Sequence, residues 1–313
     1  MAGTPLRSVR VAVIQDAPVV FDLEPTLAKV ADLAGRAAAT GARLAVFPEA
    51  FVGGYPKGMD FGAVIGSRTD EGREQFRRYW AGAIDVPGPA TARLGQAAAE
   101  AGLHLVIGVI ERDGGTLYCT ALFFRPDGEL LGKHRKLMPT AMERLVWGFG
   151  DGSTMPVIDT PLGRIGAVIC WENYMPLMRA AMYAKGIELY CAPTADDREM
   201  WQATVRHIAR EGRCFVLSAC QFLRRSDCPE DYPVATAPDT VLMGGGSCIV
   251  APTGELLAGP ARDGCCVLLA DLDLDDIPRN TFDFDAVGHY ARPDIFQLQV
   301  DERAKPPVVG GEV

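Results

Sequence analysis

The segment RIGAVICWENYMPLMRAAMYAKGIELYCA, residues 164–192, decides the class of fold. Its first part, residues 164–170, is an apolar run that predicts a buried strand. Residues 175–185 then predict a helix that ends at Gly186, and residues 188–192 predict a second strand. A strand, a helix and a strand in this order predict a crossover connection with the helix packed on one face of a sheet.

The same alternation continues on both sides of this segment. Further strands are predicted at residues 9–14, 43–47, 214–221, 247–251 and 265–271, and further helices at 24–40, 90–101 and 201–211. A hairpin joins residues 104–111 to 117–124 through Asp113-Gly114-Gly115. Hairpins and crossovers together predict an α/β protein with helices on the faces of its sheets. No low-complexity linker interrupts residues 8–300, so we expect one domain over residues 1–313 with a loose tail from Ala304.

Composition excludes several classes of function. The net charge of −9 argues against nucleic-acid binding, which requires a basic face. No apolar run is long enough to cross a bilayer, and residues 1–10 lack the apolar core of a signal peptide. We therefore expect a cytoplasmic protein without a membrane partner. Nine cysteines, an odd number, indicate reduced thiols, and four scattered histidines show no metal-ligand spacing, so we expect no metal site.

Three reactive side chains lie at the ends of predicted strands. Glu49 follows the run 44–48, Lys136 follows 130–135, and Cys170 closes 165–169. In α/β proteins, functional groups collect at the carboxyl ends of strands. A thiol between a strand and a helix can meet backbone N–H groups and the positive end of the helix, and both favour the thiolate.

Each of these residues also has a plainer interpretation. Cys170 could be one more buried core cysteine, because cysteine is often buried. Glu49 could be a solvated loop acid, and Lys136 lies in a basic cluster that could be a surface run or a phosphate-binding patch. Cys191 ends another predicted strand and could be a second thiol, and His134 could pair with Cys170. From the residues alone, a thiol hydrolase is one interpretation among several.

Three longer segments resemble the motifs of the nitrilase superfamily of carbon–nitrogen hydrolases. Residues 47–56 (FPEAFVGGYP) resemble its glutamate motif, residues 134–140 (HRKLMPT) its lysine motif and residues 170–176 (CWENYMP) its cysteine motif. The resemblance covers about residues 8–300 and continues through residues 143–148, 150–153, 190–196 and 288–294. Three motifs in this order are highly specific.

This resemblance implies an αββα sandwich and a Glu-Lys-Cys triad that works without a cofactor. It implies Cys170 as the nucleophile and Glu49 as the general base. Lys136 is implied as the group that stabilises the tetrahedral intermediate. Glu143 matches a second active-site glutamate, which positions the substrate or the attacking water.

The cysteine motif and the Met-Pro that follows it are similar to true nitrilases of plant and related bacterial type. The resemblance therefore implies that an organic nitrile and water react to the carboxylic acid and ammonia through a thioimidate and a thioester on Cys170. Tyr55, Trp171, Tyr174 and Thr194 are the candidate substrate-binding residues. The resemblance also implies a homo-oligomer, either a dimer or a larger, spiral assembly.

Three other functions compete with this one. An amidase or a carbamoylase would use the same triad. A catalytically silent binding protein would lack the glutamate, the lysine or the cysteine, and none is missing. A redox thiol would require an exposed Cys170, whereas the enzyme requires one at the bottom of a pocket.

Overall fold

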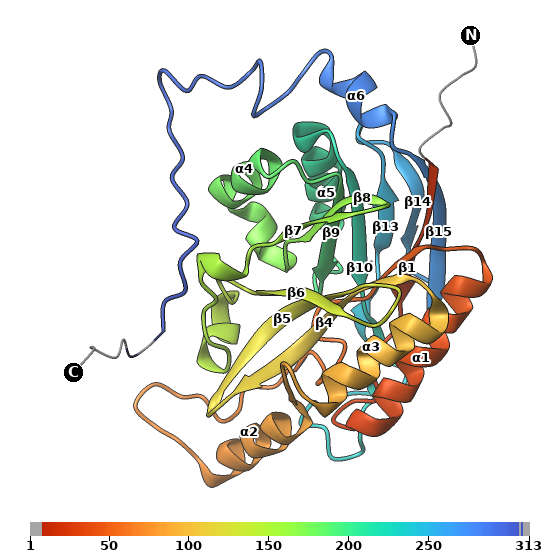
Figure 1. The fold of residues 1–313 in the computed structure, drawn as a ribbon. Coiled ribbons are helices and arrows are strands. Elements are labelled where there is room, and N and C mark those ends of the chain that lie inside the picture. The colour runs from red at the N-terminus through yellow and green to blue at the C-terminus, as the bar shows by residue number, and fades with distance from the viewer. Residues whose placement is uncertain (1–7, 307, 309–313) are drawn as a thin grey trace.

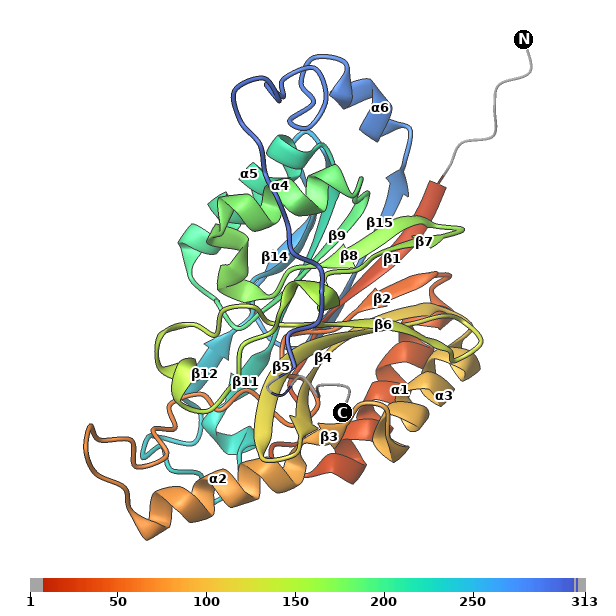
Figure 2. The same cartoon turned by 60° about the vertical axis from the view of Figure 1, so that its left-hand side comes forward.

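The computed structural model describes residues 8–306 and residue 308. Four layers follow one another in the order helix, sheet, sheet, helix (Figures 1 and 2), which confirms the predicted αββα sandwich. The absence of a signal peptide was inferred partly from residues 1–7, and these lie outside the described residues, as does most of the tail predicted to be loose. The assignment to a single domain stays a prediction.

Within the described residues, the first sheet has the strand order β15-β1-β2-β4-β5-β6, and β3 pairs with β4. Its strands are β1 (Ser8–Gln15), β2 (Leu44–Val46), β3 (Ile84–Asp85), β4 (His104–Asp113), β5 (Thr116–Phe124), β6 (Leu130–Arg135) and β15 (Cys266–Asp273). The helices α1 (Leu23–Ala39) and α3 (Pro89–Ala101) cover its outer face. In β1, Val11 and Val13 point toward the second sheet, and Ala12 and Ile14 point toward these helices. Both faces are buried, which explains the continuous apolar run.

The second sheet has the order β14-β13-β10-β9-β8-β7 in the described part of the chain. Its strands are β7 (Val157–Thr160), β8 (Gly163–Ala167), β9 (Leu189–Thr194), β10 (Phe215–Cys220), β13 (Ser247–Val250) and β14 (Leu256–Ala261). The helices α4 (Pro176–Ala184) and α5 (Glu199–Gly212) pack on its outer face. In β9, Leu189 and Cys191 face the first sheet, and Tyr190 and Ala192 face the helices. The main core therefore lies between the two sheets.

The sequence pattern does not predict several elements of the fold. They are α2 (Asp70–Gly82), β3, β7, β14, the pair β11 (Phe222–Arg224) and β12 (Val241–Gly244), α6 (Asp276–Thr281), and the 3-10 segments η1 (Ala141–Leu145), η2 (Gly152–Thr154), η3 (Cys170–Tyr174) and η4 (Arg225–Asp227). The helix α2 is largely polar, and its short apolar face of Phe76, Tyr79 and Trp80 contacts the core only near its end. No helix of the described residues is both long and apolar enough to cross a membrane.

The strand predicted at residues 164–170 is shorter than expected. It ends as β8 at Ala167, and Cys170 begins the 3-10 segment η3 rather than the helix α4. Parallel pairing joins β2 to β4 and β8 to β9, so the segments that carry Glu49 and Cys170 leave their sheets at the carboxyl ends of parallel strands.

Candidate active site

Glu49 lies in a tight, buried loop directly after β2. Its side chain is fully buried, and the next residue, Ala50, takes a φ of +49°. The side-chain amide of Gln221 donates to the carbonyl oxygen of Glu49 at 2.8 Å. The loop also lies against Gly108 of β4, where an added Cβ would come within 2.3 Å of the carbonyl oxygen of Pro48. The backbone around the carboxylate is therefore fixed from two sides.

Lys136 lies directly beyond β6 and is fully buried. Its Nζ donates to Oε1 of Glu49 at 2.7 Å and to Oε2 of Glu143 at 2.8 Å. Burial lowers the pKa of Lys136, but the charges of Glu49 and its neighbours outweigh burial and raise that pKa well above its ordinary value. Lys136 is therefore a buried ammonium held between two carboxylates.

The interpretation of the basic cluster as a solvated surface run is wrong. Lys133 and Arg135 both pair with Glu111, which is buried on β4, two strands away across β5. His134 pairs with Glu172, and Lys136 pairs with the carboxylates described above. The basic side chains on both faces of β6 therefore form ion pairs with buried carboxylates.

Glu143 and Tyr55 form the second half of this site. Oε1 of Glu143 accepts a hydrogen bond from the hydroxyl of Tyr55 at 2.8 Å, and Oε2 accepts from Lys136 and from the backbone N–H of Thr140. The ring of Tyr55 lies edge-on to Trp147, with centroids 5.9 Å apart. Burial, followed by the charge of Glu143, raises the pKa of Tyr55, so its hydroxyl stays a donor.

Cys170 has a φ of +50°, a left-handed conformation that is uncommon for any residue except glycine. The side-chain amide of Asn173 stabilises this turn by donating to the carbonyl oxygens of Val168 and Cys170 at 2.9 and 2.8 Å. Sγ is buried and accepts a hydrogen bond from Oγ1 of Thr194 at 3.2 Å. The turn therefore holds the sulfur in one position.

The charges around the sulfur contradict one expectation from the sequence. Burial raises the pKa of the Cys170 thiol, and the charge of Glu49 raises it further, although Lys136 and the Thr194 hydroxyl lower it. Burial also raises the pKa of Glu49 above its ordinary value, although Lys136 lowers it. The sequence predicts a thiolate stabilised by a helix N-terminus, whereas these surroundings disfavour the thiolate in the resting site. The raised pKa favours the protonated thiol of Cys170, and Glu49 beside it is a carboxylate that can accept the proton.

His134 does not pair with Cys170. Its Nε2 lies 2.9 Å from Oε2 of Glu172, and its Nδ1 lies 2.6 Å from the carbonyl oxygen of Thr154. The redox alternative also fails, because Cys170 is only 4% exposed. Cys191 is a packed residue of β9, and burial alone raises its pKa. Among the described residues, no group of three or more His, Cys, Asp or Glu side chains could hold a metal ion.

The four candidate substrate-binding residues lie in two different settings. Tyr55 and Thr194 contact Glu143 and Cys170 directly, as described above. Trp171 and Tyr174 are 40% and 43% exposed and lie edge to face, with centroids 5.4 Å apart. The indole N–H of Trp171 donates to Asp196 at 2.8 Å, which fixes the ring. These two rings lie on the solvent side of the cysteine segment, and their contact with substrate stays a prediction.

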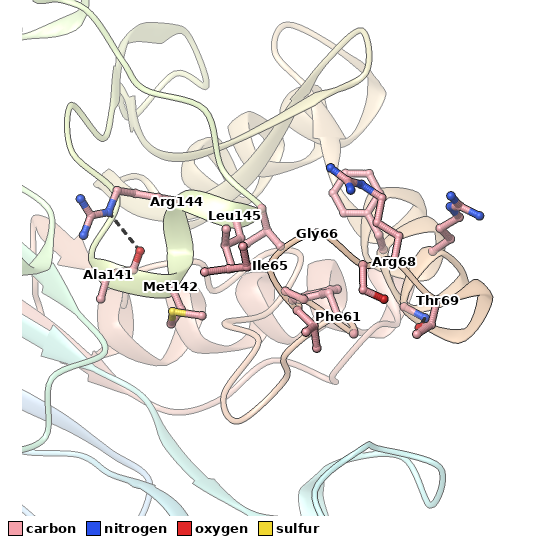
Figure 3. A pocket seen from close by; sticks show the side chains of 17 residues that line it. Phe61, Ile65, Gly66, Arg68, Thr69, Ala141, Met142, Arg144 and Leu145 are labelled. Atoms are coloured by element: carbon pink, nitrogen blue, oxygen red, sulfur yellow. Dashed lines mark hydrogen bonds between the residues drawn. The ribbon is translucent and has the colours of Figure 1, made fainter.

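A cavity of about 800 Å³ lies on the other side of η1 (Figure 3). Met142 and Leu145 of η1 face Phe61 and Ile65 of the loop 61–69 across it, and the first turns of α2 complete its wall. Glu143 does not line this cavity but contacts Lys136. The segment η1 therefore has the contact of Glu143 with Lys136 on one side and a largely apolar cavity on the other.

Comparison with known proteins agrees with this geometry. Residues 10–279 match the family described as carbon-nitrogen hydrolase. The chain is 66% identical to a protein named aliphatic nitrilase from Sinorhizobium fredii, with 96% of this chain and 98% of that protein covered. It is 58% identical to the bifunctional nitrilase/nitrile hydratase NIT4B of Nicotiana tabacum, with 96% and 88% covered. The fold is similar to an amidase from Nesterenkonia sp., with a TM-score of 0.66 and 22% identity over 88% of this chain and 94% of that one. The chain therefore belongs to the carbon–nitrogen hydrolase family, the nitrilase superfamily whose three motifs it carries.

Proposed function

We propose that the protein is a nitrilase that converts an organic nitrile and two molecules of water to a carboxylic acid and ammonia. The 66% identity to an aliphatic nitrilase over nearly the whole chain carries this proposal. The contact of Lys136 with both Glu49 and Glu143, beside Cys170, supplies the groups that such a reaction needs. We further propose that Cys170 is the nucleophile, Glu49 the general base and Lys136 the stabiliser of developing negative charge.

The first step forms the bond between sulfur and carbon. Glu49 takes the proton of the Cys170 thiol while Sγ adds to the nitrile carbon, and the C≡N bond becomes C=N. Oε1 of Glu49 already accepts from Lys136, whereas the buried Oε2 has no hydrogen-bond partner among the described residues. Oε2 is thus the oxygen that receives the proton. The proton then passes to nitrogen and gives a neutral thioimidate.

The second step releases ammonia. Glu49 takes a proton from a water molecule, which adds to the thioimidate carbon and forms a tetrahedral intermediate. Lys136 and the backbone N–H of Trp171 stabilise its charge, and one such donor contributes about 3 kcal/mol. Glu49 returns this proton to the nitrogen, and a second proton moves from the new hydroxyl to the nitrogen as the C=O bond forms. The C–N bond then breaks, which releases ammonia and leaves a thioester on Cys170. A second water hydrolyses the thioester, releases the acid and restores the thiol.

The same tetrahedral intermediate has a second exit. If the C–S bond breaks before the C–N bond, the product is the amide and no ammonia is released. The relative from Nicotiana tabacum is named as both a nitrilase and a nitrile hydratase. We therefore propose the amide as a minor product of this chain, whereas an amidase or carbamoylase as the main activity has weaker support.

A panel of aliphatic, aromatic and arylaliphatic nitriles, with the matching amides, tests the proposal. Ammonia, acid and amide are measured for the parent and for Cys170→Ala, with Cys214→Ala as a control for the loss of a buried thiol remote from the site. We expect nitriles to release ammonia faster than their amides, and we expect activity to vanish only in Cys170→Ala. Turnover of amides alone would replace the proposal with an amidase.

We also propose a cytoplasmic homo-oligomer. Leu177 of α4 and Met200 of α5 are 67% and 71% exposed on the outer helical layer, which supports a shared face there. Light scattering of the purified protein tests this, and a monomer at all concentrations would exclude it.

A further inference from the structure

A second buried thiol lies against the catalytic carboxylate. Cys119 is on β5, and its Sγ donates to Oε1 of Glu49 at 3.5 Å. Its backbone carbonyl accepts from the backbone N–H of Lys136 at 2.8 Å. One residue thus contacts the proposed base through its side chain and the proposed lysine through its backbone.

We propose that Cys119 is a positioning residue that holds Glu49 with Oε2 turned to the nucleophile. This inference rests on the proposed function of Glu49 as the base that deprotonates Cys170. Oε1 has two donors, Lys136 at 2.7 Å and Cys119 at 3.5 Å, whereas Oε2 has none among the described residues. A carboxylate rotates about its last bond unless donors fix one of its oxygens. One donor from β5 and one from the residue directly after β6 both bind Oε1, which leaves Oε2 as the oxygen for proton transfer.

The alternative role for Cys119 is packing alone, because it is also part of the core between the sheets. The two roles differ in what they do to Glu49. A donor to the ionised carboxylate favours the charged form, so its loss raises the pKa of Glu49. A packing contact affects stability and leaves that pKa unchanged.

Other charged and titratable groups also act on Glu49, and the test must hold them constant. They are Lys136, Glu143, Cys170, Tyr55 and Cys220. Substitution of Cys119 itself leaves all five in place. The thiol of Cys119 stays protonated because burial and then the charge of Glu49 raise its pKa well above the ordinary value. Cys119 is therefore a donor throughout the working range of pH.

The experiment measures how the rate of alkylation of Cys170 by iodoacetamide depends on pH, with mass spectrometry of the labelled peptide. The kcat/KM profile for the best nitrile is measured in parallel. Cys119→Ala and Cys119→Val remove the donor, the first with a smaller side chain and the second with a larger one, so that a shift common to both does not come from a change of volume. Cys119→Ser keeps a donor, and Cys214→Ala controls for the loss of a buried thiol elsewhere.

We expect the acid limb of both profiles to move up by about half a pH unit in Cys119→Ala and Cys119→Val. In these two variants kcat at neutral pH should fall by up to about threefold, the most that this shift produces, with KM unchanged. Cys119→Ser and Cys214→Ala should keep the parental limb. The inference is overturned if the acid limb of folded Cys119→Val lies at the parental pH. It is also overturned if Cys119→Ser shifts the acid limb as far as Cys119→Val does. The proposed function fails by a different result, namely if the parent releases no ammonia from nitriles. The two failures are distinguishable because alkylation of Cys170 reports on Glu49 without any substrate.

Discussion

The imidazole Nε2 of His134 lies 2.9 Å from Oε2 of Glu172, and both side chains are fully buried. His134 stands two residues before Lys136, and Glu172 stands two residues after Cys170. Glu172 also accepts from the backbone N–H of Ile169 at 2.9 Å and from that of Leu137. A single carboxylate therefore joins the end of β6 to the cysteine segment, and it sets the distance between the proposed lysine and nucleophile.

Replacement of Glu172 should therefore weaken both the fold and the site. Glu172→Gln leaves His134 buried without a charged partner, and loss of one partner of a buried pair costs about 3 kcal/mol. Urea denaturation measures this loss against Glu255→Gln, an exposed control. We also expect kcat to fall more than KM rises. Equal stability of the two variants would contradict the linking role of Glu172.

The His134–Glu172 pair should also make stability depend on pH. Burial lowers the pKa of His134, but Glu172 outweighs burial and raises it above the ordinary value. A raised pKa in the folded state gives stability that is complete below the unfolded pKa, about 6.5, and disappears as pH rises through the folded value. The difference in free energy of unfolding between the parent and His134→Gln should thus be larger at pH 6 than at pH 9. The same difference at both values would show that His134 is neutral in the fold.

Thr194 should matter through its hydroxyl. Oγ1 donates to Sγ of Cys170 at 3.2 Å, and this bond lowers the pKa of the thiol. Thr194→Val removes the donor and keeps the shape, so kcat should fall about tenfold, as expected for the loss of one hydrogen bond to a developing charge. Thr194→Ser should retain most activity. If kinetics show that valine and serine variants are equally active, Thr194 serves only packing.

Gly108 should be intolerant of any side chain. A Cβ there would lie 2.3 Å from the carbonyl oxygen of Pro48 and 2.7 Å from Cα of Glu49, so the loop must shift. Gly108→Ala should lose most activity and about 2 kcal/mol of stability. Gly115→Ala is the matched control, because nothing lies within 4 Å of its Cβ position. Normal activity of Gly108→Ala would mean that the Glu49 loop tolerates displacement.

The sequence predicts most of the fold where apolar runs are long. The strands β1, β4, β5 and β10 and the helices α1, α3, α4 and α5 follow from their periodicity and from glycines at their ends. The missed elements are polar or very short. The helix α2 buries three residues, and β14 (Leu256–Ala261) is largely exposed and contains Gly259-Pro260, which reads as a turn.

The sequence predicts only those site residues that lie in the recognised motifs. Resemblance of the motifs singles out Glu49, Lys136, Cys170 and Glu143, and the structure brings the four together. The roles of Cys119, Gly108 and Glu172 depend on which residues of separate strands lie opposite one another. Pairing register of this kind has no signal in a single sequence, so these contacts appear only in the structure.

The central claim is that Cys170 forms a covalent bond to the nitrile carbon. Rapid-quench mass spectrometry of the parent with a good nitrile tests it most directly, with Cys170→Ala as the control. The account predicts a transient adduct on the peptide that carries Cys170, equal in mass to the nitrile or to its acyl group. Full turnover without any such adduct, or an adduct on Cys191 instead, would contradict it.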